Sequence, residues 1–313
     1  MNSETFHAIS RRDVLRGLAA AGLGLAGAGT AEGTSPPKAL IERAIPKSGE
    51  RIPAVGLGTW RTFDVGAGET ERAGPREVLK LFAAAGARVV DSSPMYGRAE
   101  TLVGDLAAEL GLSGKLFLAT KVWTSGRRAG IAQMERSMKR MRTAKLDLMQ
   151  VHNLMDWETH LDTLAEWKKA GKVRYVGITH YTESAYDELE EVMARAEIDF
   201  VQFNYNIIRR EAEQRLLPLA KERGIAVLVN RPFMGAGLFD RVRGKQLPAW
   251  AREIDCASWA QFFLKFILSH PAVTCAIPAT SKPKHALDNL GGGRGRLPDA
   301  KMRERMAEHV GKL

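Results

Sequence analysis

Short apolar runs alternate along the chain with longer stretches in which apolar residues recur every three or four positions. The first pattern is typical of buried strands, and the second is typical of helices with one apolar face. The predicted strands cover 54–57, 88–91, 116–120, 148–151, 175–178, 200–203, 226–230 and 274–277. The predicted helices cover 75–85, 99–110, 131–141, 160–170, 183–196, 211–223, 256–269 and 284–290. This repeated alternation predicts an α/β fold, the (β/α)8 TIM barrel, with functional residues at the C-terminal ends of the strands.

Residues 38–313 form one predicted domain, because no linker or internal repeat interrupts the alternation. Residues 40–53 contain a turn at 47–50 and predict a hairpin that closes the bottom of the barrel. The segment 234–252 is irregular and long enough to be a functional loop. The tail after Gly291 carries no motif that we can assign, and its shortness predicts a relatively open barrel mouth.

Residues 1–31 run from charged to apolar to small residues, which is the order found in export leaders. The stretch SRRDVLR resembles a twin-arginine (Tat) signal, and the apolar run 17–28 is too short to span a bilayer. We therefore expect a Tat-type signal peptide at 1–31, the Tat export machinery as a partner, and a periplasmic or otherwise exported location. A disordered tail is the alternative, and without a functional leader the protein would be cytoplasmic. No later stretch offers about 18 consecutive apolar residues, so no stable membrane anchor is expected.

Three glycines in this leader, Gly22, Gly24 and Gly27, have the G-x-G-x-x-G spacing of a dinucleotide-binding turn. Such a turn needs a buried strand before it and a helix after it, so that phosphate oxygens meet free backbone N–H groups. The charged residues upstream and the prolines downstream, Pro36 and Pro37, fit neither requirement. The nucleotide site is therefore expected elsewhere.

The net charge of +10 lies in the chain after the leader, whose own charges nearly balance. A basic protein favours anionic partners, but no basic run with interleaved aromatic residues is present. We therefore expect a phosphorylated ligand and no nucleic acid. The two cysteines, Cys256 and Cys275, are expected to be buried apolar residues rather than a disulfide, and no metal site is expected from their spacing.

Three consecutive predicted strands end in residues suited to acid–base chemistry. Asp91 ends the second strand and Tyr96 follows it, Lys121 follows the third strand, and His152 follows the fourth. Each residue alone has an ordinary structural explanation, such as a helix cap or a satisfied core histidine. Their joint placement at one face of the barrel predicts a catalytic cluster.

These residues lie in the motifs G-L-G-T-W (56–60), D-S-S-P-M-Y-G (91–97), K-V-W (121–123) and V-H-N (151–153). With them the chain resembles the aldo-keto reductase family over about residues 52–289. The resemblance implies an NAD(P)H-dependent oxidoreductase that reduces an aldehyde or ketone to an alcohol. It also implies that Asp91, Tyr96, Lys121 and His152 form the catalytic tetrad.

The chemistry of a tyrosine proton donor explains why these four residue types occur together. A free tyrosine has a pKa near 10 and gives up its proton reluctantly at neutral pH. The Lys121 ammonium favours the phenolate, Asp91 holds that lysine, and Tyr96 thereby becomes a usable acid when hydride reaches a carbonyl carbon. His152 would orient the carbonyl oxygen or share the donation.

The same resemblance implies where a nicotinamide would be held. Gln202 matches the family's carboxamide-binding glutamine, and Thr179 and His180 stand where the family usually has a Ser-Asn pair. Asn230 stands where the family normally has a tyrosine that stacks on the nicotinamide ring, with Arg231 or Phe233 as possible substitutes. This is the largest departure from the family pattern.

The segment AIPATSKPKHALDN (276–289) resembles the family's segment for the adenosine half of the cofactor. Its matching polar positions are Thr280, Ser281 and Asn289, and the nearby Lys282 and Lys284 are expected to take the place of the family's usual phosphate-binding cations. A 2′-phosphate prefers paired cationic donors, so NADP(H) is expected before NAD(H). Solvated lysines at a helix start are the alternative interpretation.

Trp60 and Trp123 match positions that line the family's substrate opening, where with His152 they would favour an apolar or aromatic carbonyl compound. Core packing is the alternative for both tryptophans.

Two other function classes stay open. A nucleotide-binding sensor or partner-binding protein on the same barrel, with weak catalysis, is favoured by Asn230 and His180. A barrel hydrolase would use Asp91 and His152 with a metal ion.

Overall fold

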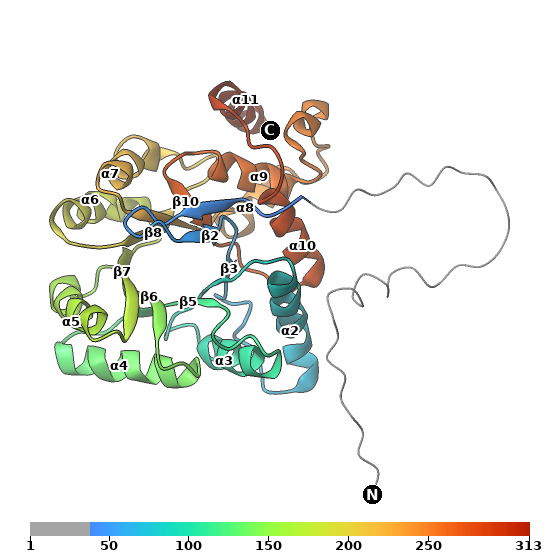
Figure 1. Cartoon of the computed structure of the whole chain (residues 1–313). Coiled ribbons are helices and arrows are strands. Elements are labelled where there is room, and N and C mark those ends of the chain that lie inside the picture. Colours follow the sequence, from blue (N-terminus) through green and yellow to red (C-terminus); the bar gives the residue numbers. More distant parts are fainter. Residues whose placement is uncertain (1–37) are drawn as a thin grey trace, which may run out of the picture. The chain divides into compact units, whose positions relative to one another are not determined.

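The computed structural model describes residues 38–313 (Figure 1). The predicted export leader, residues 1–31, lies outside these described residues. Within residues 38–313, no helix is long and apolar enough to cross a membrane.

Eight parallel strands, β3 to β10, form the central sheet, and strands that follow one another in sequence are hydrogen-bonded neighbours in it. They are β3 (Leu57–Gly58), β4 (Val89–Asp91), β5 (Phe117–Val122), β6 (Leu146–His152), β7 (Val173–Thr179), β8 (Phe200–Asn204), β9 (Ala226–Asn230) and β10 (Val273–Ala276). The backbone N–H groups of Gly56 and Gly58 donate to Ala276 and Pro278 at 2.8 and 3.1 Å, which joins the first strand to the last. The predicted (β/α)8 barrel is thereby confirmed, although the first strand is shorter than predicted.

A helix follows each of these strands along the chain, and Figure 1 shows these helices around the sheet. They are α2 (Glu69–Ala84), α3 (Ala99–Glu109), α4 (Arg127–Arg140), α5 (Trp157–Lys169), α6 (Tyr186–Arg195), α7 (Leu216–Glu222), α9 (Trp259–Leu268) and α10 (Pro283–Gly292). The helix predicted at 75–85 begins six residues earlier, because the Glu71 carboxylate accepts the N–H groups of Gly66 and Gly68 and caps the helix before Pro75. The helix predicted at 211–223 is divided into a 3₁₀ turn, Glu211–Glu213, and α7.

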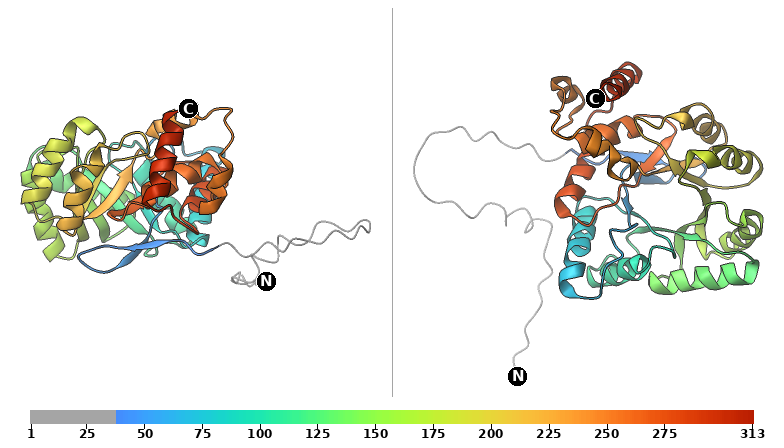
Figure 2. Two further views of the ribbon diagram at one scale, coloured as in Figure 1. Left: turned by 90° about the horizontal axis from the view of Figure 1, so that it is seen from above. Right: turned by 180° about the vertical axis from the view of Figure 1, so that it is seen from behind.

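A two-stranded hairpin closes the N-terminal end of the barrel, as predicted. Its antiparallel strands are β1 (Glu42–Ala44) and β2 (Arg51–Pro53). In Figure 2 (left) the hairpin, in blue, lies beneath the barrel. Ile45 and Ile52 pack on Phe117, Tyr175 and Phe200 in one buried cluster inside the barrel. We call this hairpin-covered end the closed end. The opposite end, where the C-terminal ends of the parallel strands lie, is called the open end.

Two C-terminal segments differ from the sequence interpretation. The segment 234–252 contains a short helix, α8 (Gly237–Arg241), between two 3₁₀ turns, Met234–Ala236 and Ala249–Ile254. The tail contains α11 (Ala300–Gly311), which no sequence motif indicated. Arg303 holds this helix in place by donating to Tyr205 Oη at 2.7 Å, to Glu213 Oε1 at 2.7 Å and to Ser269 Oγ at 2.8 Å.

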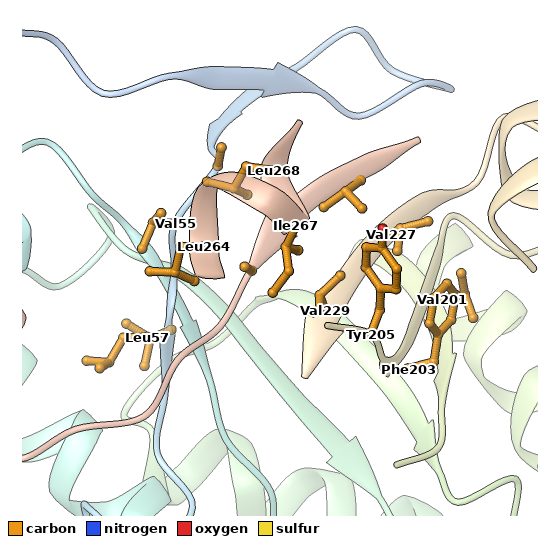
Figure 3. Close-up of a cluster of buried hydrophobic side chains, with 14 of the residues drawn as sticks. Val55, Leu57, Val201, Phe203, Tyr205, Val227, Val229, Leu264, Ile267 and Leu268 are labelled. Carbon is orange, nitrogen blue, oxygen red and sulfur yellow. The ribbon is translucent and has the colours of Figure 1, made fainter. Parts of the chain in front are cut away.

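The larger apolar core lies between the strands and the helices. Figure 3 shows part of it, where β8 and β9 contribute Val201, Phe203, Val227 and Val229, and α9 contributes Leu264, Ile267 and Leu268. Side chains alternate along a strand, so Phe200 and Gln202 face the barrel interior while Val201 and Phe203 face the helices. Cys256 and Cys275 are both free and buried, which confirms the prediction for them.

Candidate active site

The structure brings the four predicted catalytic residues together at the open end. Asp91 and His152 end β4 and β6, Lys121 lies in β5, and Tyr96 lies in the loop after β4. The Lys121 ammonium donates to Asp91 Oδ2 and to the Ser92 carbonyl, each at 2.6 Å. It also lies 5.1 Å from the centroid of the Tyr96 ring. The catalytic roles stay predictions, but the required proximity is present.

Burial and charge act in opposite directions on Lys121 and Tyr96. Burial disfavours the Lys121 ammonium, but the interactions with Asp91 and Tyr96 together outweigh this effect, and the pKa of Lys121 lies above its ordinary value. Burial raises the pKa of Tyr96, whereas the Lys121 charge lowers it and the Asp91 charge raises it. The net result is a raised pKa, so burial outweighs the activating effect that the sequence predicts for Lys121. Tyr96 therefore keeps its proton at neutral pH, as a proton donor must.

His152 is buried and neutral beside these groups. Burial, then the charges of Lys121 and His180, lower the pKa of His152 to about 2. Its ring lies 6.0 Å from the Tyr96 ring, edge to face, and its Nδ1 lies 3.0 Å from Ser93 Oγ. The Ser93 contact was not predicted, although Ser93 stands inside the motif at 91–97.

A chain of amides extends from Asp91 across the barrel interior. Gln150 and Gln202 both donate from Nε2 to Asp91 Oδ1, at 3.1 and 3.0 Å, and Gln202 Nε2 also lies 3.1 Å from Gln150 Oε1. Asn230 Nδ2 donates to the His180 carbonyl at 3.1 Å and to Gln202 Oε1 at 3.3 Å. The predicted cofactor residues Gln202 and Asn230 are thus connected to Asp91. Gln150 was missed, and its signal was a lone amide in the apolar strand LDLMQVH.

The other predicted nicotinamide residues lie at the ends of β7 and β9. Thr179 is buried, and its carbonyl accepts the N–H of Asn153 at 2.7 Å. His180 stacks on Tyr181, and its Nδ1 accepts the N–H of Thr182 at 3.3 Å. Arg231 is exposed, has a left-handed backbone with φ of 48°, and lies 5.7 Å from the Tyr181 ring.

The predicted adenosine-binding residues form a separate group after β10. Thr280 and Ser281 lie in the turn before α10, where Thr280 Oγ1 accepts the Lys282 N–H at 3.0 Å. Lys282 and Lys284 are exposed, and Asn289 is buried within α10. This group lies outside the hydrogen-bonded cluster around Asp91.

The two predicted substrate-lining tryptophans differ in their surroundings. Trp60 is 48% exposed, which argues against core packing, and the Arg61 guanidinium lies 4.4 Å from the centroid of its ring. Trp123 is half-buried, with its ring 6.4 Å from that of His152. Both aromatic surfaces therefore belong to loops at the open end.

Three asparagine side chains at strand ends of the open end have buried amide oxygens without a protein donor. They are Asn153 after β6, Asn204 at the end of β8 and Asn230 at the end of β9. An unsatisfied buried acceptor is costly unless a ligand or water supplies a donor. Between residues 38 and 313, no three His, Cys, Asp or Glu side chains gather in a way that could hold a metal ion.

The sequence and the structure match known proteins over most of the chain. The model of the Aldo/keto reductase family matches residues 54–308. The methylglyoxal reductase YeaE of Escherichia coli is 32% identical over 266 residues, which cover 80% of this chain and 89% of YeaE. The aldo-keto reductase YhdN of Bacillus subtilis is 30% identical over 201 residues, and the match covers 59% of this chain and 60% of YhdN.

Solved structures support the fold. An aldo/keto reductase from Klebsiella pneumoniae in complex with NADP and acetate superimposes with a TM-score of 0.71 at 24% identity, covering 85% of this chain and 94% of that one. The holo form of AKR11C1 from Bacillus halodurans gives a TM-score of 0.69 at 23% identity, covering 87% and 96%. At these identities the likeness concerns the barrel.

Proposed function

The chain belongs to the aldo/keto reductase family, and we propose that it reduces an aldehyde or ketone to an alcohol, with NADPH as the hydride donor. The observation that carries this proposal is the buried Lys121–Asp91 pair, with the Lys121 ammonium 5.1 Å from the Tyr96 ring and the His152 ring 6.0 Å from that of Tyr96. The name of the relative YeaE, a methylglyoxal reductase, agrees with a small carbonyl compound as substrate.

Tyr96 is the proton donor in this proposal. A reduced nicotinamide, when bound, supplies the hydride that adds to the carbonyl carbon. The Tyr96 hydroxyl passes its proton to the carbonyl oxygen, which becomes the alcohol, and the resulting phenolate is stabilised by Lys121. Asp91 fixes the Lys121 ammonium, and His152 offers a neutral ring N–H to the same oxygen.

The residues at the open end fit a nicotinamide cofactor. The side-chain oxygen of Asn230 is buried without a hydrogen-bond donor. The carboxamide group of a nicotinamide has N–H groups that could donate to this oxygen. The nicotinamide half of the cofactor would be surrounded by Thr179, His180, Gln202, Asn230 and Arg231. The adenosine half would be held by Thr280, Ser281, Lys282, Lys284 and Asn289. The two lysines would favour NADP(H) over NAD(H), because they can pair with the 2′-phosphate that only NADP(H) carries.

Trp60 and Trp123 would line the substrate opening with His152. Their exposed or half-buried rings favour apolar or aromatic carbonyl compounds, because burying aromatic surface stabilises such complexes.

The test is carbonyl-dependent oxidation of NADPH, followed by absorbance with an aromatic aldehyde. Tyr96→Phe should lower kcat about 10²- to 10⁴-fold, the range for loss of a general acid, and leave the Kd for NADPH unchanged. Equal turnover by Tyr96→Phe and the wild type would contradict the assignment of the acid.

A nucleotide-binding sensor with weak catalysis is the second candidate, and Asn230 in place of the stacking tyrosine favours it. Tight NADPH binding without turnover of any carbonyl compound would support this candidate. Asn230→Tyr would then be expected to raise turnover.

We also propose that residues 1–31 direct export by the twin-arginine route. The replacement of Arg11 and Arg12 by lysine should leave the protein in the cytoplasm of an expressing bacterium, whereas the wild type should appear in the periplasm. The same distribution for both proteins in cell fractions would reject this proposal.

A further inference from the structure

Ser93 and His152 form a buried contact that the proposed chemistry does not yet use. Ser93 is fully buried in the turn after β4, and His152 is buried at the end of β6. Ser93 Oγ lies 3.0 Å from Nδ1 of His152. The contact therefore connects the loop that carries Tyr96 to the strand that carries the histidine.

The direction of this hydrogen bond follows from the neighbours of Ser93. The N–H of Met95 lies 3.4 Å from Ser93 Oγ and donates to it. Within residues 38–313, His152 Nδ1 is the one acceptor in hydrogen-bond reach of the Ser93 hydroxyl. A buried hydroxyl without an acceptor is costly, so the Ser93 proton points to Nδ1.

The proton on His152 is then determined as well. A neutral imidazole carries one N–H, on either Nδ1 or Nε2. When Nδ1 accepts from Ser93, the N–H must be on Nε2. A histidine with the N–H on Nδ1 would instead present a lone pair at Nε2, which repels a carbonyl oxygen.

We propose that Ser93 is a positioning residue that holds His152 in the Nε2–H form, so that His152 donates to the carbonyl oxygen beside Tyr96. The catalytic consequence rests on the proposed reductase function, whereas the form of the imidazole does not. Ser93 does not touch the substrate in this account and acts through His152.

The neighbouring serine provides a matched control. Ser92 is equally buried, but its hydroxyl oxygen accepts from Thr59 Oγ1 at 3.0 Å and is not bonded to His152. Removing either hydroxyl deletes one buried oxygen from the same turn. A difference between the two variants therefore reports on the bond to His152.

The experiment is ¹⁵N NMR of the imidazole rings in the full chain, with the His152 signals assigned by their loss in His152→Asn. The wild type should show a protonated Nε2 and an unprotonated Nδ1 for His152, and Ser92→Ala should keep this signature. Ser93→Ala should shift His152 toward the Nδ1–H form and lower kcat about 5- to 20-fold, with the Kd for NADPH within twofold. The signature in the wild type tests the proposal even if Ser93→Ala folds poorly.

Two results would overturn the proposal: a proton on Nδ1 of His152 in the wild type, or the same signature in Ser93→Ala and wild type. Failure of the reductase function is a separate result, because it would appear as absent turnover in the wild type. The imidazole signature would be measured in either case.

Discussion

Glu50, at the closed end of the barrel, is surrounded by partners. Arg88 lies 3.2 Å from Oε1, Tyr175 donates to Oε2 at 2.7 Å, and Arg174 also binds this carboxylate. Burial raises the pKa of Glu50, but Tyr175 and Arg174 outweigh that effect and the pKa lies below its ordinary value. The open end differs, because the amide oxygens of Asn153, Asn204 and Asn230 lack donors there.

The backbone shows the same difference. Six non-glycine residues in loops that follow the strands at the open end have positive φ angles: Arg61, Asn153, Leu154, Asp156, Arg231 and Met234. Such conformations cost about 1–3 kcal/mol each and concentrate at functional sites. The contacts at the closed end therefore stabilise the barrel. Backbone strain and unsatisfied hydrogen-bond acceptors lie at the open end, where a ligand is expected to bind.

Lys121 lies at the open end but should matter for both stability and catalysis. Its replacement should therefore have the largest effect of the changes considered. Lys121→Met would leave the buried Asp91 carboxylate without its cation, which costs about 3–5 kcal/mol of unfolding free energy for buried pairs. It would also remove the charge that stabilises the Tyr96 phenolate, so kcat should fall at least about 100-fold. Urea unfolding and NADPH oxidation measure the two effects.

Lys168→Met is the control for Lys121→Met, because Lys168 also pairs with an aspartate, Asp199, but its side chain is 46% exposed. This variant should lose less stability and keep the wild-type kcat. An Lys121→Met protein as stable as wild type would contradict the account of the buried pair.

The buried His152 should make the open end sensitive to acid. Its pKa is about 2 in the folded protein against 6.5 ordinarily, so below pH 6.5 the unfolded chain gains a proton that the folded one does not. Stability should therefore fall as the pH falls from 6.5 toward 2. At pH 4.5 the loss due to His152 is about 3 kcal/mol, from roughly 1.4 kcal/mol for each unit below the unfolded pKa.

Denaturant unfolding of wild type and His152→Asn at pH 7 and 4.5 measures this loss. His180, His270 and His309 also have lowered pKa values, but they are present in both proteins, so the difference isolates His152. Parallel pH dependences for the two proteins would show that His152 is not held neutral by burial.

Asp64 should have the smallest effect. Its Oδ1 accepts the N–H of Arg98 at 2.9 Å and lies against Gly97, whose positive φ of 55° and lack of space exclude a side chain. This hydrogen bond stabilises the loop after β4, which contains Tyr96. Asp64→Ala should lower kcat about fivefold, the worth of about 1 kcal/mol in one hydrogen bond, while Asp64→Asn keeps an acceptor and most of the activity. Steady-state kinetics would refute this role if the two variants were equally impaired.

The sequence predicted the barrel and its four candidate catalytic residues because parallel strands bring their C-terminal ends to one face. Ser93 and Gln150 were missed as site residues, because a sequence does not reveal which hydroxyl or amide turns toward a neighbour. The helix α11 was missed for a related reason: its position depends on Arg303 reaching Tyr205 and Glu213, which are distant in sequence.

Two tyrosine-to-phenylalanine changes test the division between the ends most directly. Tyr96→Phe removes a hydroxyl at the open end, and Tyr175→Phe removes one that contacts Ser48 and Glu50 at the closed end. Turnover with NADPH and the free energy of unfolding would be measured for both variants. We expect Tyr96→Phe to lose turnover with wild-type stability, and Tyr175→Phe to lose about 1–2 kcal/mol of stability with wild-type kcat. Comparable turnover losses in the two variants, or full activity in Tyr96→Phe, would contradict the account.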